Sequence, residues 1–278
     1  MRKSKNPKRA APNVVAIIPA RGGTQSTPYK NLLKLSGKPL LWWAIDVALK
    51  AKTIDAVVVS TEDPWIARVA RRYGALVAPR PKEFSQPNSD DSGWYRHAVQ
   101  WMKETYGWEP ELLVNLRPTG PLRTPEDVDA CVHHVLLTDC DGLKTVIPTP
   151  IPPYKMWTMR KDGSLRPLLP HPYRLKHGPD IPRQRAQKKF PVYWQDAQID
   201  ITRPKFVFGE AAHKYGNCFG PNIHGYVMDE RKVVDIDTPE DLRHAAAVLG
   251  ELQKESRPKA RRPRSSMKFQ SKKKIAPL

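Results

Sequence analysis

The residues near the start of the chain that are best suited to chemistry lie in one loop, residues 19–31, with the sequence PARGGTQSTPYKN. Gly22 and Gly23 let backbone N–H groups approach phosphate oxygens closely, because glycine has no Cβ. Arg21 can donate to two oxygens at once, whereas Lys30 supplies a mobile point charge. The loop therefore predicts a polyphosphate site. It has neither the P-loop sequence nor the dinucleotide-binding fingerprint, so a simple turn is the alternative.

A second candidate group is acidic and lies near the other end of the chain. Asp235 and Asp237 stand two apart in a segment, 233–237, whose sequence predicts a strand, and alternate side chains of a strand point to the same face. Mg²⁺ prefers oxygen ligands and often takes one or two carboxylates together with substrate phosphates. The spacing predicts a metal site. A purely structural alternative is that acidic residues close to a helix start interact favourably with the helix dipole.

The elements that must position these residues alternate between strand and helix. Short apolar runs followed by turn residues predict buried strands, and apolar residues at helical spacing predict helices. The predicted strands are 14–19, 54–60, 75–78, 112–116, 142–147 and 233–237, and the predicted helices are 39–50, 64–73, 125–137 and 239–249, the last two capped by Thr124 and Thr238. Because parallel neighbours need crossover helices, this order predicts an α/β fold with a doubly wound, mostly parallel sheet. In such a sheet, ligands bind beyond the carboxyl ends of the strands, where the loop 19–31 lies.

Residues 148–192 interrupt the alternation. The segment is rich in proline and in basic residues, so helices are excluded and loops or extended stretches are predicted. A segment of this length without periodicity is unusual inside a compact domain unless it has a function of its own.

Charge separates a core from two tails. The chain has 278 residues and a formal net charge of +19, of which residues 1–12 contribute +5 and residues 251–278 contribute +8. Both stretches predict disordered basic tails around a core of residues 13–250, because they hold too few apolar residues to offset the entropy of ordering. The tails keep the protein soluble or, as the alternative, bind nucleic acid or address the protein to a nucleus.

Composition also limits the compartment. No apolar run approaches the roughly 20 residues that a membrane-spanning helix needs, so a membrane protein is not expected. The three cysteines, Cys131, Cys140 and Cys218, have no spacing typical of a disulfide framework or a zinc site. A reducing compartment, the cytoplasm, is therefore the expectation.

Six short segments occur in a fixed order along the core: IIPARGG (17–23), PYKN (28–31), GKPL (37–40), VVVSTED (57–63), RPTGPLR (117–123) and DIDTPED (235–241). In this combination the chain resembles the acylneuraminate cytidylyltransferase family and its octulosonate relatives, which activate acidic sugars. The resemblance covers about 13–250 and implies a Rossmann-like nucleotidyltransferase fold. It also implies transfer of CMP from CTP to the anomeric hydroxyl of an acidic keto-sugar, such as a sialic acid-like nonulosonate, with release of pyrophosphate. The implied cofactor is Mg²⁺, and the implied assembly is a homodimer in which 148–192 is the dimerisation insertion.

The resemblance also implies roles for individual residues. The nucleotide-binding set is Ala20, Arg21, Gly22, Gly23, Lys30, Asn31, Arg80 and Ser89, the last beside Asp90. The sugar-binding set is Arg117, Thr119, Arg183 and Gln184, with Arg183 or Arg185 reaching the active site of the partner. Asp235 and Asp237 are the implied metal ligands, and Arg21, Lys30 and Asp237 are the implied catalytic residues.

Three positions depart from the usual pattern of the family. Gln25 stands where a phosphate-facing lysine is common, Arg117 where a sugar-facing glutamine is common, and Asp196-Ala197 where an Asn-Gly pair is common. A different sugar or nucleotide is therefore one alternative. A degenerate transferase core that binds nucleic acid through its basic tails is the other.

Overall fold

β1 (Val14–Pro19) lies at the centre of the fold because its apolar run is buried on both faces. Its even-numbered residues, such as Ala16 and Ile18, belong to one core cluster, and its odd-numbered residues, Val15 and Ile17, belong to another. This division follows from the alternation of side chains along a strand. A strand with two apolar faces has to be covered by other elements on both sides.

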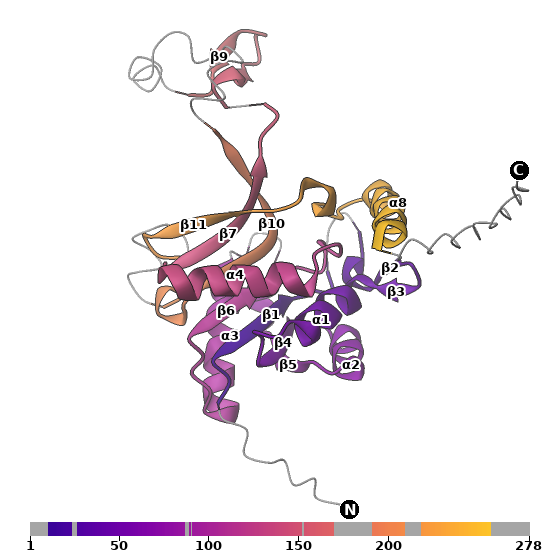
Figure 1. The fold of residues 1–278 in the computed structure, drawn as a ribbon, viewed down its shortest axis with the longest axis vertical. Helices are drawn as coiled ribbons and strands as arrows, with labels where there is room; N and C mark the ends of the chain where they lie inside the picture. Colours follow the sequence, from indigo (N-terminus) through magenta and orange to yellow (C-terminus); the bar gives the residue numbers. More distant parts are fainter. Residues whose placement is uncertain are drawn as a thin grey trace, which may run out of the picture.

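The computed structural model describes residues 11–23, 27–86, 89, 91–151, 153–169, 191–208 and 218–256. Within them, one sheet of seven strands has the order β11-β7-β10-β6-β1-β4-β5 (Figure 1). Besides β1, its members are β4 (Ala56–Thr61), β5 (Leu76–Pro79), β6 (Leu112–Asn115), β7 (Gly142–Pro148), β10 (Tyr193–Thr202) and β11 (Ile223–Val227). Neighbouring strands are parallel except at β10, which is antiparallel to β6 and to β7. The predicted mostly parallel, doubly wound sheet is confirmed.

Helices cover both faces of the sheet. The helices α1 (Leu40–Lys50), α2 (Pro64–Arg72) and α4 (Pro125–Thr138) pack into the first core cluster, and α3 (Asp91–Tyr106) packs into the second. The last helix, α8 (Pro239–Ser256), packs with the short strands β2 (Lys34–Leu35) and β3 (Lys38–Pro39) around a third, smaller cluster. None of the helices in these described residues is long and apolar enough to cross a membrane.

Two predictions of local structure are wrong at the C-terminal end. Residues 233–237 form no strand, because β11 pairs only with β7 and leaves this segment without a strand partner. The helix predicted over 239–249 continues to Ser256, so the residues 251–256, which were predicted to be disordered, are helical. Glu251, Gln253 and Lys254 are good helix formers and extend α8 by nearly two turns beyond its last buried residue, Leu249. Residues 1–10 and 257–278 lie outside the described residues.

An arm rises from the sheet where β7 and β10 continue together beyond their neighbours (Figure 1). Its tip carries the hairpin of β8 (Trp157–Met159) and β9 (Leu165–Pro167). This arm contains the described part of the predicted insertion, 148–192, whose residues 170–190 are not described. Large apolar side chains on the arm are exposed, among them Trp157, Met159 and Trp194.

Candidate active site

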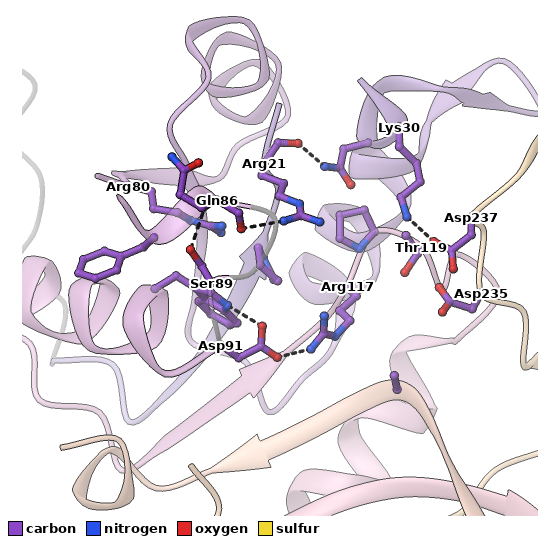
Figure 2. A pocket seen from close by; sticks show the side chains of 16 residues that line it. Arg21, Lys30, Arg80, Gln86, Ser89, Asp91, Arg117, Thr119, Asp235 and Asp237 are labelled. Atoms are coloured by element: carbon purple, nitrogen blue, oxygen red, sulfur yellow. Dashed lines mark hydrogen bonds and ion pairs between the residues drawn. The ribbon is translucent and has the colours of Figure 1, made fainter. Parts of the chain in front are cut away.

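The carboxyl ends of β1, β5 and β6 open onto a cavity of about 370 Å³ (Figure 2). The cavity lies where a doubly wound sheet binds its ligands. Nine predicted site residues line it, namely Arg21, Lys30, Asn31, Arg80, Ser89, Arg117, Thr119, Asp235 and Asp237. The structure thus brings together the glycine loop and the acidic pair, which lie at opposite ends of the chain.

An ion pair joins the two groups. Nζ of Lys30, in the short 3-10 helix η1 (Lys30–Leu32), lies 2.5 Å from Oδ1 of Asp237. The lysine side chain is 13% exposed and the aspartate side chain 62%. In the irregular segment before α8, Val234 and Ile236 are buried while Asp235 and Asp237 are exposed and line the cavity. The two carboxylates therefore share a face as predicted, although the segment is not a strand.

The glycine loop, residues 19–31, is held in place by hydrogen bonds on the side away from the cavity. The backbone N–H of Gly22 donates to Oε1 of Glu62 at 2.7 Å, and Nδ2 of Asn31 donates to the carbonyl of Arg21 at 2.9 Å. A Cβ on Gly22 would lie 2.7 Å from Oδ2 of Asp63, so the close approach of loop and helix α2 requires glycine here. Ala20, Gly22 and Gly23 are not among the residues that line the cavity. In this structure they shape the loop that carries Arg21.

Arg80 is a buried cation that lines the cavity. Its Nε donates to Oγ of Ser60 at 3.0 Å, its Nη2 donates to the carbonyl of Ser60 at 2.8 Å, and its guanidinium carbon lies 5.6 Å from the ring centre of Trp94. Burial lowers the pKa of Arg80 to about 10. The side chain still carries its charge at pH 7, and its direction is fixed by neutral partners.

Arg117 and Asp91 form an ion pair on the other side of the cavity. Nη2 of Arg117 donates to Oδ2 of Asp91, and Oδ1 of Asp91 accepts from Nε1 of Trp94 at 2.9 Å. Asp91 is the first residue of α3 and lines the cavity together with Trp94. Sequence reasoning missed both residues; Asp91 adjoins Asp90, which it did single out but which lies outside the described residues.

A layer of buried, hydrogen-bonded polar residues lies behind the residues that line the cavity. Arg123 donates through Nη2 to the carbonyl of Arg117 at 2.7 Å and through Nη1 to the carbonyl of Gln198 at 3.1 Å, and burial lowers the pKa of Arg123 to about 9. Asp196 accepts from Thr145 and from the backbone N–H of Gln198, while burial raises its pKa. Asp196, one of the departures from the family pattern, therefore lies beneath the site, while its neighbour Ala197 lines it.

The acidic pair fits a hard divalent cation that completes its coordination with substrate oxygens. Within the described ranges, no group of three or more His, Cys, Asp or Glu side chains could hold a metal by itself. Two carboxylates facing a cavity with three arginines and a lysine match the way Mg²⁺ binds together with phosphates. The predicted residues Gln25, Arg183, Gln184 and Arg185 lie outside the described residues.

Comparison with known families identifies the core. Residues 15–144 match the family model described as Cytidylyltransferase. The match covers just under half of the chain, which is similar there to the cytidylyltransferases. Together with the relatives described next, it indicates an enzyme of the nucleotidyltransferase class.

The relatives of this chain differ in how much of their own length it matches. N-acylneuraminate cytidylyltransferase A of Danio rerio is 31% identical over 145 residues, 52% of this chain and 33% of that protein, so the chain spans about a third of it. The CMP-N,N'-diacetyllegionaminic acid synthase of Legionella pneumophila is 29% identical over 233 residues, 82% of this chain and 92% of the relative. A solved structure of CMP:2-keto-3-deoxy-manno-octonic acid synthetase in complex with CTP is similar in fold, with a TM-score of 0.60, 17% identity, and 86% of this chain and 99% of that chain covered.

The family model and the cavity overlap in part. The matched residues 15–144 include Arg21, Lys30, Arg80 and Arg117, whereas Asp235 and Asp237 follow the matched region. The acidic side of the site is thus supplied by the C-terminal part of the core, through the segment that leads into α8.

Proposed function

We propose that the protein transfers CMP from CTP to the anomeric hydroxyl of an acidic keto-sugar and releases pyrophosphate. The observation that carries this proposal is the cavity in which Arg21 and Lys30 face Asp235 and Asp237 (Figure 2). Transfer of a nucleotidyl group from a triphosphate needs cations that bind the oxygens of the phosphate chain and carboxylates that bind the accompanying metal. The Legionella relative, named for synthesis of a CMP-sugar acid, matches most of the chain and supports the sugar class.

The proposed reaction is an in-line displacement at the α-phosphorus of CTP. The anomeric oxygen of the sugar forms a bond to phosphorus, the bond to the pyrophosphate oxygen breaks, and the hydroxyl proton is released. Arg21 and Lys30 bind the phosphate chain and stabilise the leaving pyrophosphate by charge. Arg80 and Ser89 lie on the nucleotide side, and Arg117 offers a charged donor to the sugar.

Asp235 and Asp237 are the proposed ligands of Mg²⁺. When bound, this cation supplies neutralisation of phosphate charge. Because Asp237 is paired with Lys30, a cation held by Asp237 would displace the ammonium of Lys30 or lie close to it. Catalysis thus rests on positioning and electrostatics supplied by the chain's own residues.

We further propose a homodimer formed through the arm. The exposed apolar side chains of the arm, such as Trp157 and Trp194, would lose their contact with water in such an interface. Arg183 and Gln184 are proposed to reach the sugar site of the partner subunit. The cytoplasm is the proposed compartment, since the buried residues Cys131, Cys140 and Cys218 form no disulfide among the described residues.

The activity is tested by measuring pyrophosphate release from CTP and Mg²⁺ with a panel of nonulosonates and octulosonates. We expect release with at least one acidic sugar and at least a hundredfold slower release in Asp237→Ala, on the order of the loss of a metal ligand. Failure of every sugar would refute the proposal. The presence of Arg117 in the cavity favours one second candidate, a related nucleotidyltransferase with a different acceptor or base. Larger thermal stabilisation with UTP or GTP than with CTP would reveal a different base.

A further inference from the structure

Two segments that line the cavity from different parts of the sequence are bonded to each other. We call residues 117–124 the sugar-side loop, since it carries Arg117 and Thr119, and residues 233–238 the carboxylate segment, since it carries Asp235 and Asp237. The backbone N–H of Ile236 donates to the carbonyl of Thr119 at 3.0 Å. This single bond ties the middle of one segment to the middle of the other.

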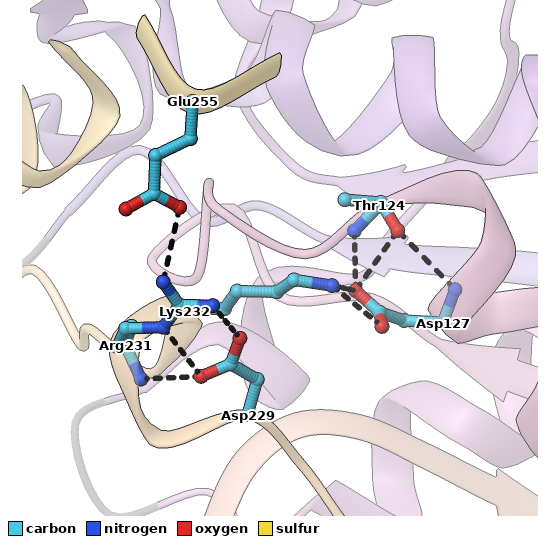
Figure 3. A network of polar contacts seen from close by, with 6 residues as sticks. All are labelled: Thr124, Asp127, Asp229, Arg231, Lys232 and Glu255. Atoms are coloured by element: carbon cyan, nitrogen blue, oxygen red, sulfur yellow. Dashed lines mark hydrogen bonds and ion pairs between the residues drawn. The ribbon is translucent and has the colours of Figure 1, made fainter. Parts of the chain in front are cut away.

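One carboxylate joins the ends of the same two segments (Figure 3). Asp127, in the first turn of α4, accepts through Oδ2 from the backbone N–H of Thr124 at 2.8 Å. This bond fixes the last residue of the sugar-side loop to α4. Both oxygens of Asp127 also accept from Nζ of Lys232, each at 2.9 Å, immediately before the carboxylate segment. The side chains of Lys232 and Asp127 are only 21% and 16% exposed, so solvent screens this ion pair less than a surface pair.

The neighbouring ion pairs are less suited to hold the segment. Arg231 contacts Asp229 and Glu255, but the side chains of Arg231 and Glu255 are 61% and 63% exposed (Figure 3). Exposed pairs of this kind contribute little to stability, because solvent screens them. Asp229 and Arg231 also lie within the same turn, so their contact does not connect it to another element. The bond from Lys232 to Asp127 does connect the turn to α4.

We propose that Asp127 and Lys232 are positioning residues that fix Asp235 and Asp237 relative to the sugar-side loop. Neither Asp127 nor Lys232 lines the cavity, so both act through the segments they join. The inference rests on the proposed function, because it assigns these residues to the metal side of the proposed reaction. Partners outside the ligand shell commonly change metal affinity by about 10- to 100-fold when they are replaced.

The test uses variants that break the ion pair in different ways. Asp127→Asn keeps an oxygen that can accept from Thr124 but removes the charge that Lys232 needs, whereas Lys232→Met removes the ammonium and Lys232→Arg preserves the charge. Glu111→Gln is the matched control, because it breaks a comparable ion pair with Arg203 at the other end of β6, where Arg203 is 12% and Glu111 43% exposed.

Two measurements on the full chain decide the outcome. Hydrogen exchange without any ligand should be faster in both the sugar-side loop and the carboxylate segment of Asp127→Asn and Lys232→Met. The affinity for Mn²⁺ in the presence of CTP should fall about tenfold in the same two variants. Lys232→Arg should retain most of the protection from exchange and most of the Mn²⁺ affinity. The double variant, Asp127→Asn with Lys232→Met, should lose no more Mn²⁺ affinity than the more affected single variant, because both residues serve one contact.

The inference would be overturned if the hydrogen-exchange rates of the two segments and the Mn²⁺ affinity were the same in Asp127→Asn, Lys232→Met and the parent. So would the same changes in Glu111→Gln, since they would mean that any loss of stability suffices. If the parent itself binds no Mn²⁺ with CTP, the proposed function fails. The exchange measurement, made without ligand, then still decides whether Asp127 and Lys232 fix the two segments.

Discussion

Replacing Lys30 by methionine should change metal binding in opposite directions without and with nucleotide. In this structure, Nζ of Lys30 lies 2.5 Å from Oδ1 of Asp237. A cation that binds Asp237 must therefore compete with the ammonium of Lys30. Once CTP is bound, the same ammonium is a donor to the phosphates, so its loss should weaken binding of the metal–nucleotide complex.

The size of the change in metal affinity without nucleotide depends on what Lys30 does when a metal binds Asp237: its ammonium either leaves the carboxylate or stays beside it. If the ammonium of Lys30 leaves, the cost is that of breaking a partly exposed ion pair, about 1 kcal/mol. If it stays, a single and a double positive charge remain about 4 Å apart, which costs about 2 kcal/mol in a water-like dielectric. The less costly route decides, because the system takes the state of lower free energy. We therefore expect Lys30→Met to bind a divalent cation about fivefold more tightly than the parent without nucleotide, the equivalent of about 1 kcal/mol.

The assay is titration of Mn²⁺, followed by the electron paramagnetic resonance of the free ion, with and without CTP. Lys38→Met is the matched control: it removes one positive charge at an exposed position that does not line the cavity. The control should bind Mn²⁺ like the parent. Unchanged or weaker binding in Lys30→Met without nucleotide would refute the idea that Lys30 keeps the carboxylate occupied.

Three further predictions concern the glycine loop, the cavity residue Arg117 and Asp200, a buried acid of β10. Gly22→Ala should lower the thermal midpoint of unfolding, because its Cβ would lie 2.7 Å from Asp63, whereas Gly23→Ala has open space and should leave the midpoint unchanged; equal midpoints would contradict this. Arg117→Gln should raise the KM for an acidic sugar by about tenfold, the worth of a charged hydrogen bond, while an altered KM for CTP instead would argue for a nucleotide role. Burial raises the pKa of Asp200, so its contribution to folding is present below about pH 4 and is lost as the pH rises through the folded-state pKa. Urea unfolding should thus show Asp200→Asn gaining stability relative to the parent from pH 4 to pH 7, and a constant difference would speak against it.

Local sequence was sufficient for the parts of the site next to strongly patterned elements. β1 is a continuous apolar run, so the position of Arg21 and Lys30 after it could be predicted. The shared face of Asp235 and Asp237 was predicted from alternation alone and survives without a strand. The alternation has a packing cause, because Val234 and Ile236 are drawn into the third core cluster whether or not a neighbour provides hydrogen bonds.

Sequence reasoning missed the elements in which polar residues are buried. β10 carries Asp196, Gln198 and Asp200, all of which are buried, whereas such residues are normally found on the surface. Only the tertiary partners, such as Thr145 and Arg123, make their burial possible. Contacts between distant segments, such as Lys232 with Asp127, leave no periodic signal in the sequence at all.

The place of β10 in the sheet has a consequence for how the chain folds as it is synthesised. The strands β5, β4, β1 and β6 are complete by residue 115 and are mutual neighbours, so they can assemble early. β7 is made next but has no position beside β6, because β10 lies between them. Until the ribosome has released residues 193–202, the backbone N–H and C=O groups along that edge of β6 have no strand partner. A nascent chain in that interval presents an unpaired sheet edge, which is a template for aggregation.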